Sequence, residues 1–223
     1  MGFYSLVAFF QKGGMFMYPI LLVFAVGLAI AFERWVQLNR TQLANQKMWS
    51  LLQPVLLKGE FDKARQIANK DKSGMAQMLG MGLARQGAVR RRDDIEIAME
   101  ESMMEIIPQL EKRTPYVALL SNIATLLGLL GTIMGLIEAF TAVANANPAE
   151  KADLLSASIS VAMNTTAFGL MSAIPLLLFH AKLTSTTGQI VDSLEMASVK
   201  TLNTISNFAK RQFDRSDYDQ TTA

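Results

Sequence analysis

Three long apolar runs, none containing Asp, Glu, Lys or Arg, constrain this chain more than any other feature. They cover residues 15–32, 116–137 and 154–179, which are 18, 22 and 26 residues long. A helix needs roughly 17–25 such residues to cross the hydrocarbon core of a bilayer. The runs therefore predict an all-α membrane protein with three transmembrane helices. The alternative, buried helices of a soluble all-α protein, would require shorter runs or runs striped with polar residues.

The rest of the chain is predicted to be helical around these spans, with the second and third helices extended into the cytoplasm. The expected segments are an N-terminal interfacial helix at 1–14, transmembrane helices at 15–37, 115–144 and 154–180, a cytoplasmic helical segment at 38–114, a periplasmic loop at 145–153, and a cytoplasmic C-terminal helix and tail at 181–223.

Proline, glycine and acidic residues mark the helix ends within the middle segment. Pro54 is expected to end the first helix, and short helices are expected at 59–69 and 75–86. A long helix should open at Arg92-Asp93-Asp94, because acidic side chains favour a helix N-terminus. Ile95, Met99, Met103 and Ile106 should face inward along it, and Pro108 and Pro115 should kink it before the bilayer.

The distribution of Lys and Arg predicts the orientation in the membrane. Residues 33–114 carry fourteen of them, whereas 145–153 and the first fourteen residues carry one each. Short loops rich in Lys and Arg stay in the cytoplasm. We therefore expect a periplasmic N-terminus and a cytoplasmic C-terminus, in a chain that contacts lipid.

The sequence gives no support for an enzyme. Residues 33–114 contain no histidine, cysteine, phosphate-binding glycine loop or nucleophile elbow. The chain has no cysteine, and its single histidine, His180, cannot form a metal site alone. We expect no catalytic residue, metal or cofactor, and interpret the Arg90 to Arg92 run as a cytoplasmic surface rather than a nucleic-acid site.

Small and hydroxyl residues form a stripe along each of the last two spans. At 100° per residue, the members of each stripe fall within about 80° of one another. In the second span they are Ser121, Thr125, Gly128, Thr132 and Gly135; in the third they are Ala162, Thr166, Gly169, Ala173 and His180. Two interpretations stay open: close helix packing, for which small residues are typical, and a cavity lined by threonines for an ion or a partner helix.

The apolar runs contain no carboxylate that could carry a proton across the bilayer. Glu138 lies just beyond the second run, about 120° around the helix from Thr132. A proton path normally needs a titratable group within the membrane. Any such carboxylate should therefore come from another chain, and a threonine hydroxyl could hydrogen-bond to it without carrying charge.

Two motifs in these spans resemble the MotA/TolQ/ExbB proton-channel family. They are Gly128-Leu129-Leu130-Gly131-Thr132 followed by Gly135, and Thr166-Ala167-Phe168-Gly169-Leu170 running to Ala173-Ile174-Pro175. Three spans and a large segment between the first and second match the ExbB/TolQ branch. One departure is Val161, where that branch often has a glutamate five residues before the threonine of the third span.

The resemblance implies a pentamer in the bacterial inner membrane that encloses ExbD- or TolR-like single-span partners, each with a membrane aspartate. Proton flow through that aspartate would drive rotation, with a TonB- or TolA-like protein transmitting force. Thr132 and Thr166 would line the pore. Weaker pore-facing candidates are Ser121, Asn122, Thr125 and Thr165, and residues assigned to helix packing are Gly128, Gly131, Gly135 and Gly169.

The sequence supports two candidate functions. The first is the pentameric membrane subunit of a proton-driven motor. The second is a non-conducting scaffold that uses its glycines only to assemble an envelope complex. A secondary transporter is disfavoured, because the chain has three spans and no obvious inverted repeat.

Overall fold

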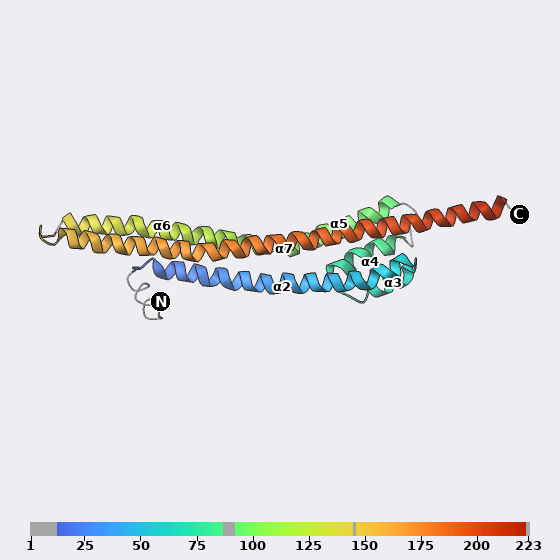
Figure 1. Cartoon of the computed structure of the whole chain (residues 1–223), viewed down its shortest axis with the longest axis horizontal. Coiled ribbons are helices and arrows are strands. Elements are labelled where there is room, and N and C mark those ends of the chain that lie inside the picture. Colours follow the sequence, from blue (N-terminus) through green and yellow to red (C-terminus); the bar gives the residue numbers. More distant parts are fainter. Residues whose placement is uncertain (1–12, 87–91, 145, 222–223) are drawn as a thin grey trace. The chain divides into compact units, whose positions relative to one another are not determined.

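The structure, a computed structural model, describes residues 13–86, 92–144 and 146–221, with side chains described up to residue 211. It is all-helical over these residues, without strands (Figure 1). The helices are α2 (Met17–Leu57), α3 (Phe61–Ala68), α4 (Gly74–Gln86), α5 (Arg92–Glu111), α6 (Thr114–Ala144) and α7 (Lys151–Thr221). The interfacial helix predicted at 1–14 falls on residues outside the described ones, apart from Gly13 and Gly14.

Three stretches of helix are long and apolar enough to cross a membrane, and they begin at Met17, Arg92 and Lys151. The chain divides into two compact units. The apolar unit holds residues 13–35 and 113–183, and the polar unit holds residues 36–112 and 184–221. Helices α2 and α7 each contribute residues to both units, whereas α6 belongs to the apolar unit alone.

The apolar unit buries small residues and exposes large ones. Ile20, Ala124 and Ala173 form a buried cluster, one residue from each of its three helices. Leu126 and Leu178 are 62% and 68% exposed, and many other large apolar side chains also point outward. Exposed large apolar side chains in such numbers are typical of a protein in contact with lipid or another protein.

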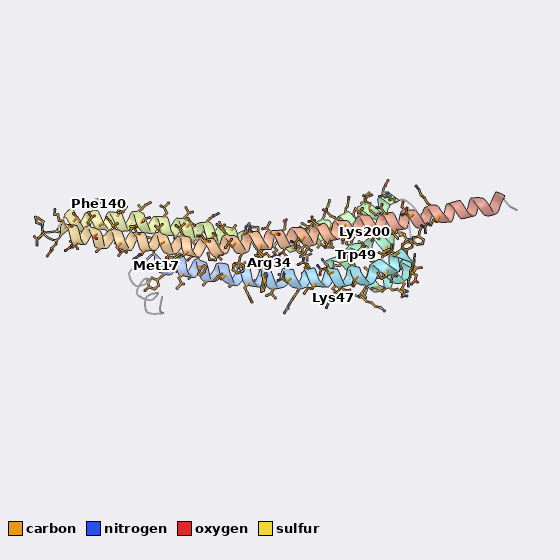
Figure 2. All side chains as sticks on the ribbon, viewed as in Figure 1. Met17, Arg34, Lys47, Trp49, Phe140 and Lys200 are labelled. Atoms are coloured by element: carbon orange, nitrogen blue, oxygen red, sulfur yellow. The ribbon has the colours of Figure 1, made fainter. Side chains whose placement is uncertain are left out.

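The polar unit has a conventional core of large apolar side chains. Helix α4 packs against both α3 and α5. Met78, Leu79 and Leu83 of α4 are buried, as are Ile95 and Met99 of α5. Figure 2 shows the side chains along these helices. Burial of such side chains stabilises the unit through the hydrophobic effect.

The prediction that Pro54 ends the first helix is wrong, because α2 continues to Leu57 with Pro54 inside it. A proline removes one helical hydrogen bond, but Leu52 and Leu56 on either side of it are fully buried, and their packing holds the backbone helical. The helix ends at Leu57, two residues before Gly59, whose φ of 77° is a left-handed conformation that glycine adopts without strain.

The long helix predicted to open at Arg92 does so, but it does not continue into the second span. α5 passes through Pro108 and ends at Glu111, and α6 begins at Thr114. Pro115 lies in the first turn of α6, where its missing N–H costs nothing. Of the inward-facing residues predicted on α5, Met103 is only half-buried, whereas the other three are buried.

Candidate functional site

Helices α6 and α7 cross at two glycines without any side chain between them. A Cβ atom on Gly128 would lie 3.2 Å from the Cα of Gly169 and 3.3 Å from the Cα of Thr166. A Cβ atom on Gly169 would lie 2.8 Å from the carbonyl oxygen of Ala124. Those neighbours are backbone atoms that cannot move aside, so the approach requires glycine on both helices.

The other two glycines of the second span face α7 side chains. A Cβ atom on Gly131 would collide with the Cγ2 methyl of Thr165, and one on Gly135 would lie 2.8 Å from the Cβ of Ala162. The small residues of the two stripes thus meet along one helix interface.

Thr132 and Thr166 come together next to this crossing. Their hydroxyl oxygens are 3.1 Å apart, and both side chains are half-buried. The Thr166 hydroxyl donates to the carbonyl of Gly128 at 2.8 Å, and the Thr132 hydroxyl donates to the carbonyl of Leu129 at 2.6 Å. With both hydrogens given to carbonyls of α6, the hydroxyl oxygens retain lone pairs that can accept hydrogen bonds.

The weaker candidates lie in different surroundings. Ser121 is fully buried and donates to the carbonyl of Ala173 at 2.8 Å, which joins α6 to α7. Thr165 is 2% exposed, and its hydroxyl reaches the carbonyl of Gly13 at 2.6 Å or that of Val161 at 3.0 Å. Thr125 is exposed and donates to Ser121 in its own helix, and Asn122 is exposed.

The structure adds contacts that the sequence did not indicate. Gly27 of α2 faces the side chain of Leu176, which would lie 2.8 Å from an added Cβ. Arg113 has a φ of 66° and forms an ion pair of 2.7 Å with Glu33. The one signal that could have found the first contact is the glycine within the first apolar run, at position 27. The ion pair joins positions eighty residues apart, and no local pattern in the sequence reveals it.

Charged groups are sparse around the threonine pair. Glu138 lies six residues beyond Thr132, and its side chain is exposed. Val161 lies next to Gly14, where its Cγ1 would be 3.1 Å from an added Cβ. Among the described residues, no group of three His, Cys, Asp or Glu side chains could hold a metal ion. The site therefore offers hydroxyl and carbonyl oxygens but no charge of its own.

Residues 70–196, more than half of the chain, match the model of the MotA/TolQ/ExbB proton channel family. The chain belongs to this family. Its match to the family covers both glycine and threonine motifs and about half of the polar unit.

The chain is also similar in sequence to named members of the family. The chain is 30% identical over 190 residues to the ExbB-like 1 biopolymer transport protein of Synechocystis sp., covering 82% of this chain and 72% of that protein. It is 34% identical over 86 residues to the Tol-Pal system protein TolQ of Haemophilus influenzae, which is 39% of this chain and 37% of that protein. It is 47% identical over 57 residues to the biopolymer transport protein exbB1 of Vibrio cholerae, about a quarter of each chain.

These matches assign the chain to the ExbB/TolQ-like branch of the MotA/TolQ/ExbB family. With its three long apolar helices, it is a multi-pass membrane protein and a membrane proton-channel subunit of the ExbB/TolQ type.

Proposed function

We propose that this chain is the pentameric subunit of a proton-driven motor in the bacterial inner membrane. In this proposal the N-terminus is periplasmic, the polar unit and C-terminus are cytoplasmic, and the motor acts through an ExbD- or TolR-like partner. The excess of Lys and Arg in residues 33–114 supports the orientation. The names of the Synechocystis, Haemophilus and Vibrio relatives support the link to envelope transport.

The observation that carries the proposal is the pair of hydroxyls of Thr132 and Thr166, 3.1 Å apart within charge-free spans. Each of the two residues is only half-buried in the protomer, so its side chain can contact a group outside the protomer. In a membrane such oxygens are suited to solvate a proton carrier that belongs to another helix. We assign both threonines to the lumen of the pentamer.

The proton carrier in this scheme is the membrane aspartate of the single-span partner. The three charge-free runs supply no carboxylate, and Val161 stands where the ExbB/TolQ branch often has glutamate. A protonated aspartate could donate to the threonine oxygens, and its deprotonated form would lose that interaction. Alternation between the two forms would couple proton flow to rotation, with a TonB- or TolA-like protein carrying the force outward.

Isosteric removal of each hydroxyl tests this function. Thr132→Val and Thr166→Val, expressed with the partner subunit, should assemble normally yet lose at least about tenfold in proton flux into liposomes, because a hydrogen bond to the carrier is lost. Thr132→Ser and Thr166→Ser should retain most of the flux. The matched control is Thr141→Val, an exposed threonine of α6 whose hydroxyl bonds to Ile137 in its own helix. Full flux in both valine variants would refute the assignment.

A non-conducting scaffold is the second candidate, and the glycine crossing favours it. Packing alone accounts for Gly128 and Gly169, because their backbones touch. A scaffold would tolerate both valine variants, would lose assembly with Gly131→Leu, and would keep its output when an uncoupler collapses the proton gradient. The motor proposal expects the output to stop with the uncoupler.

A further inference from the structure

Two helices of the polar unit carry opposite charges. Residues 36–58, the polar part of α2 and the residue after it, contain three Lys or Arg and no Asp or Glu. Residues 93–111, which form α5 after its first residue, contain seven Asp or Glu and no Lys or Arg. Helix α3 and the polar part of α7 carry charges of both signs. The chain thus separates its basic and acidic residues onto α2 and α5.

The charges lie on exposed faces of both helices. The basic face of α2 consists of Arg40, Lys47 and Lys58, and the acidic face of α5 consists of Asp93, Glu100, Glu101, Glu105 and Glu111, all exposed. At 100° per residue, the basic residues fall within about 20° of one another and the acidic residues within about 140°. Leu43 and Leu51, 57% and 56% exposed, flank the basic face, and Ile97, 52% exposed, lies within the acidic face. Figure 2 labels Lys47 on α2.

No charge of either face is paired within the protomer. Over the part of the chain that the structure describes, none of these eight side chains forms an ion pair or a hydrogen bond. Complementary charges steer two surfaces together and fix their register. Two different complementary faces on one chain join copies head to tail, and such a contact closes into a ring when the rotation between copies allows it. A second copy of this chain supplies the missing partner for both faces.

The packing around Gly74 sets a common level for the two helices. A Cβ atom on Gly74 would lie 3.2 Å from Cγ2 of Ile106 on α5 and 3.8 Å from Oδ1 of Asn45 on α2. Arg40, which precedes Asn45, lines a hollow together with Gln109, which follows Ile106. The two helices therefore run in opposite directions past this level, and the heights of their charges can be compared.

Oppositely charged residues of the two faces lie at matching heights. Arg40 and Glu111 both lie about 7.5 Å to one side of the common level, at 1.5 Å per residue. Lys47 lies about 3 Å to the other side, between the heights of Glu105 and Glu101. Rotation about the membrane normal keeps each residue at its own height, so faces of neighbouring copies match only if their heights agree. The agreement favours contact between copies in a ring around that axis.

We propose that the basic face of α2 in one copy docks on the acidic face of α5 in the next copy. Arg40 meets Glu111, and Lys47 meets Glu101 and Glu105, across each boundary between copies. This inference rests on the assembly of identical copies in the proposed function, and it identifies the surfaces that join their polar units. Exposed pairs of this kind are individually weak, so the faces act together to set the register of neighbours.

The absence of cysteine from the chain allows a direct test. Two full-length chains with different affinity tags, one with Lys47→Cys and one with Glu105→Cys, would be co-expressed, placed in lipid nanodiscs and treated with a short bismaleimide. We expect a cross-linked dimer that carries both tags, which forms only between copies. The matched control pairs Lys47→Cys with Asp192→Cys, an exposed acidic position of α7 in the polar unit, and should give little of that dimer.

Charge reversal tests the electrostatic cause of the docking. Arg40→Glu, added to the Lys47→Cys chain, should lower the yield of the two-tag dimer at least about fivefold, because like charges then face each other. Glu111→Arg, added to the Glu105→Cys chain, should restore the yield. Arg65→Glu, at an exposed position of α3, is the control and should leave the yield unchanged. High salt should lower the yield, because it screens exposed charges.

Light scattering on the wild type separates failure of this interface from failure of the proposed function. Copies that assemble but give no two-tag dimer would overturn the interface and leave the proposed motor subunit in place. A wild-type chain that stays monomeric would overturn both. The docking is also refuted if Arg40→Glu leaves the yield unchanged, or if the Lys47→Cys chain cross-links only to a different protein.

Discussion

The two units of this chain bury opposite kinds of residue. The apolar unit brings its helices together through Gly128, Gly169 and Ala124, and exposes leucines. The polar unit buries residues such as Met78 and Met99. In lipid there is no hydrophobic gain from bringing two helices together, so close backbone packing and hydrogen bonds must hold them. In water the burial of large apolar side chains does so. The same chain therefore uses two sources of stability, and substitutions should separate them.

The largest effect is expected where two backbones touch. Gly169→Leu would drive a side chain into the carbonyl of Ala124 and should destabilise the protein by about 3 kcal/mol or more. Size-exclusion profiles and thermal melts in detergent would measure it. The control is Gly188→Leu on the same helix but in the polar unit, where nothing lies within 4 Å of an added Cβ. Similar profiles for both variants would contradict the comparison.

The next effect tests the core of the polar unit. Met99→Ala leaves a cavity at a fully buried position and should lower the free energy of unfolding by about 2–5 kcal/mol. Met104→Ala on the same helix, at a position that is 72% exposed, should change it by less than about 0.5 kcal/mol. Urea unfolding followed by circular dichroism would compare them. If the two losses were equal, the packing of α4 against α5 would not be what stabilises this unit.

A smaller effect is expected at the ion pair of Arg113 and Glu33. Both side chains are about half exposed, at 50% and 51%, so the pair should contribute only about 0.2–1 kcal/mol. A double-mutant cycle with Glu33→Gln and Arg113→Gln, melted in low and high salt, would isolate that coupling. The coupling should shrink as salt rises. A coupling that is insensitive to salt would show that the pair is shielded from solvent.

The smallest effect is confined to acidic pH. Hydrogen bonds from the Ser73 side chain and backbone lower the pKa of Asp71 from its ordinary value of 3.8. Because the folded pKa is below the unfolded one, this stabilisation is fully present above pH 3.8 and is lost as pH falls through the folded pKa. Asp71→Asn should remove that part of the acid dependence of urea unfolding. The exposed Asp62→Asn serves as the control. An identical pH profile for Asp71→Asn and the wild type would contradict the prediction.

The sequence predicted the helical class, the three spans and the start of α5, because length and hydropathy determine them locally. It failed at Pro54 and in treating α5 and α6 as one kinked helix. The first outcome depends on how neighbouring side chains pack, and the second depends on the backbone conformation of one residue. Leu52 and Leu56 hold the helix across Pro54, and Arg113 adopts a left-handed conformation that no motif requires.

The sequence also singled out Thr132 and Thr166, whose hydroxyl oxygens lie 3.1 Å apart, but it could not separate neighbouring residues. Thr165 and Thr166 are adjacent, so their side chains point about 100° apart. Thr165 turns inward to the carbonyl of Gly13, whereas Thr166 stays half-buried beside Thr132. That difference depends on where residues 13–16 lie, which the pattern of one span cannot reveal. The lumenal role of Thr132 and Thr166 stays a prediction.

Because α5 and α6 are separate helices, the two threonines of the pair lie on helices of very different length. Thr166 is carried by α7, a single helix of 71 residues with Pro175 inside it. Thr132 is carried by α6, whose ladder of backbone hydrogen bonds stops at Thr114 and does not run on into α5. Torsion applied along α7 therefore passes to Thr166 through one continuous helix that contains Pro175, whereas α6 is separated from α5 at Lys112 and Arg113.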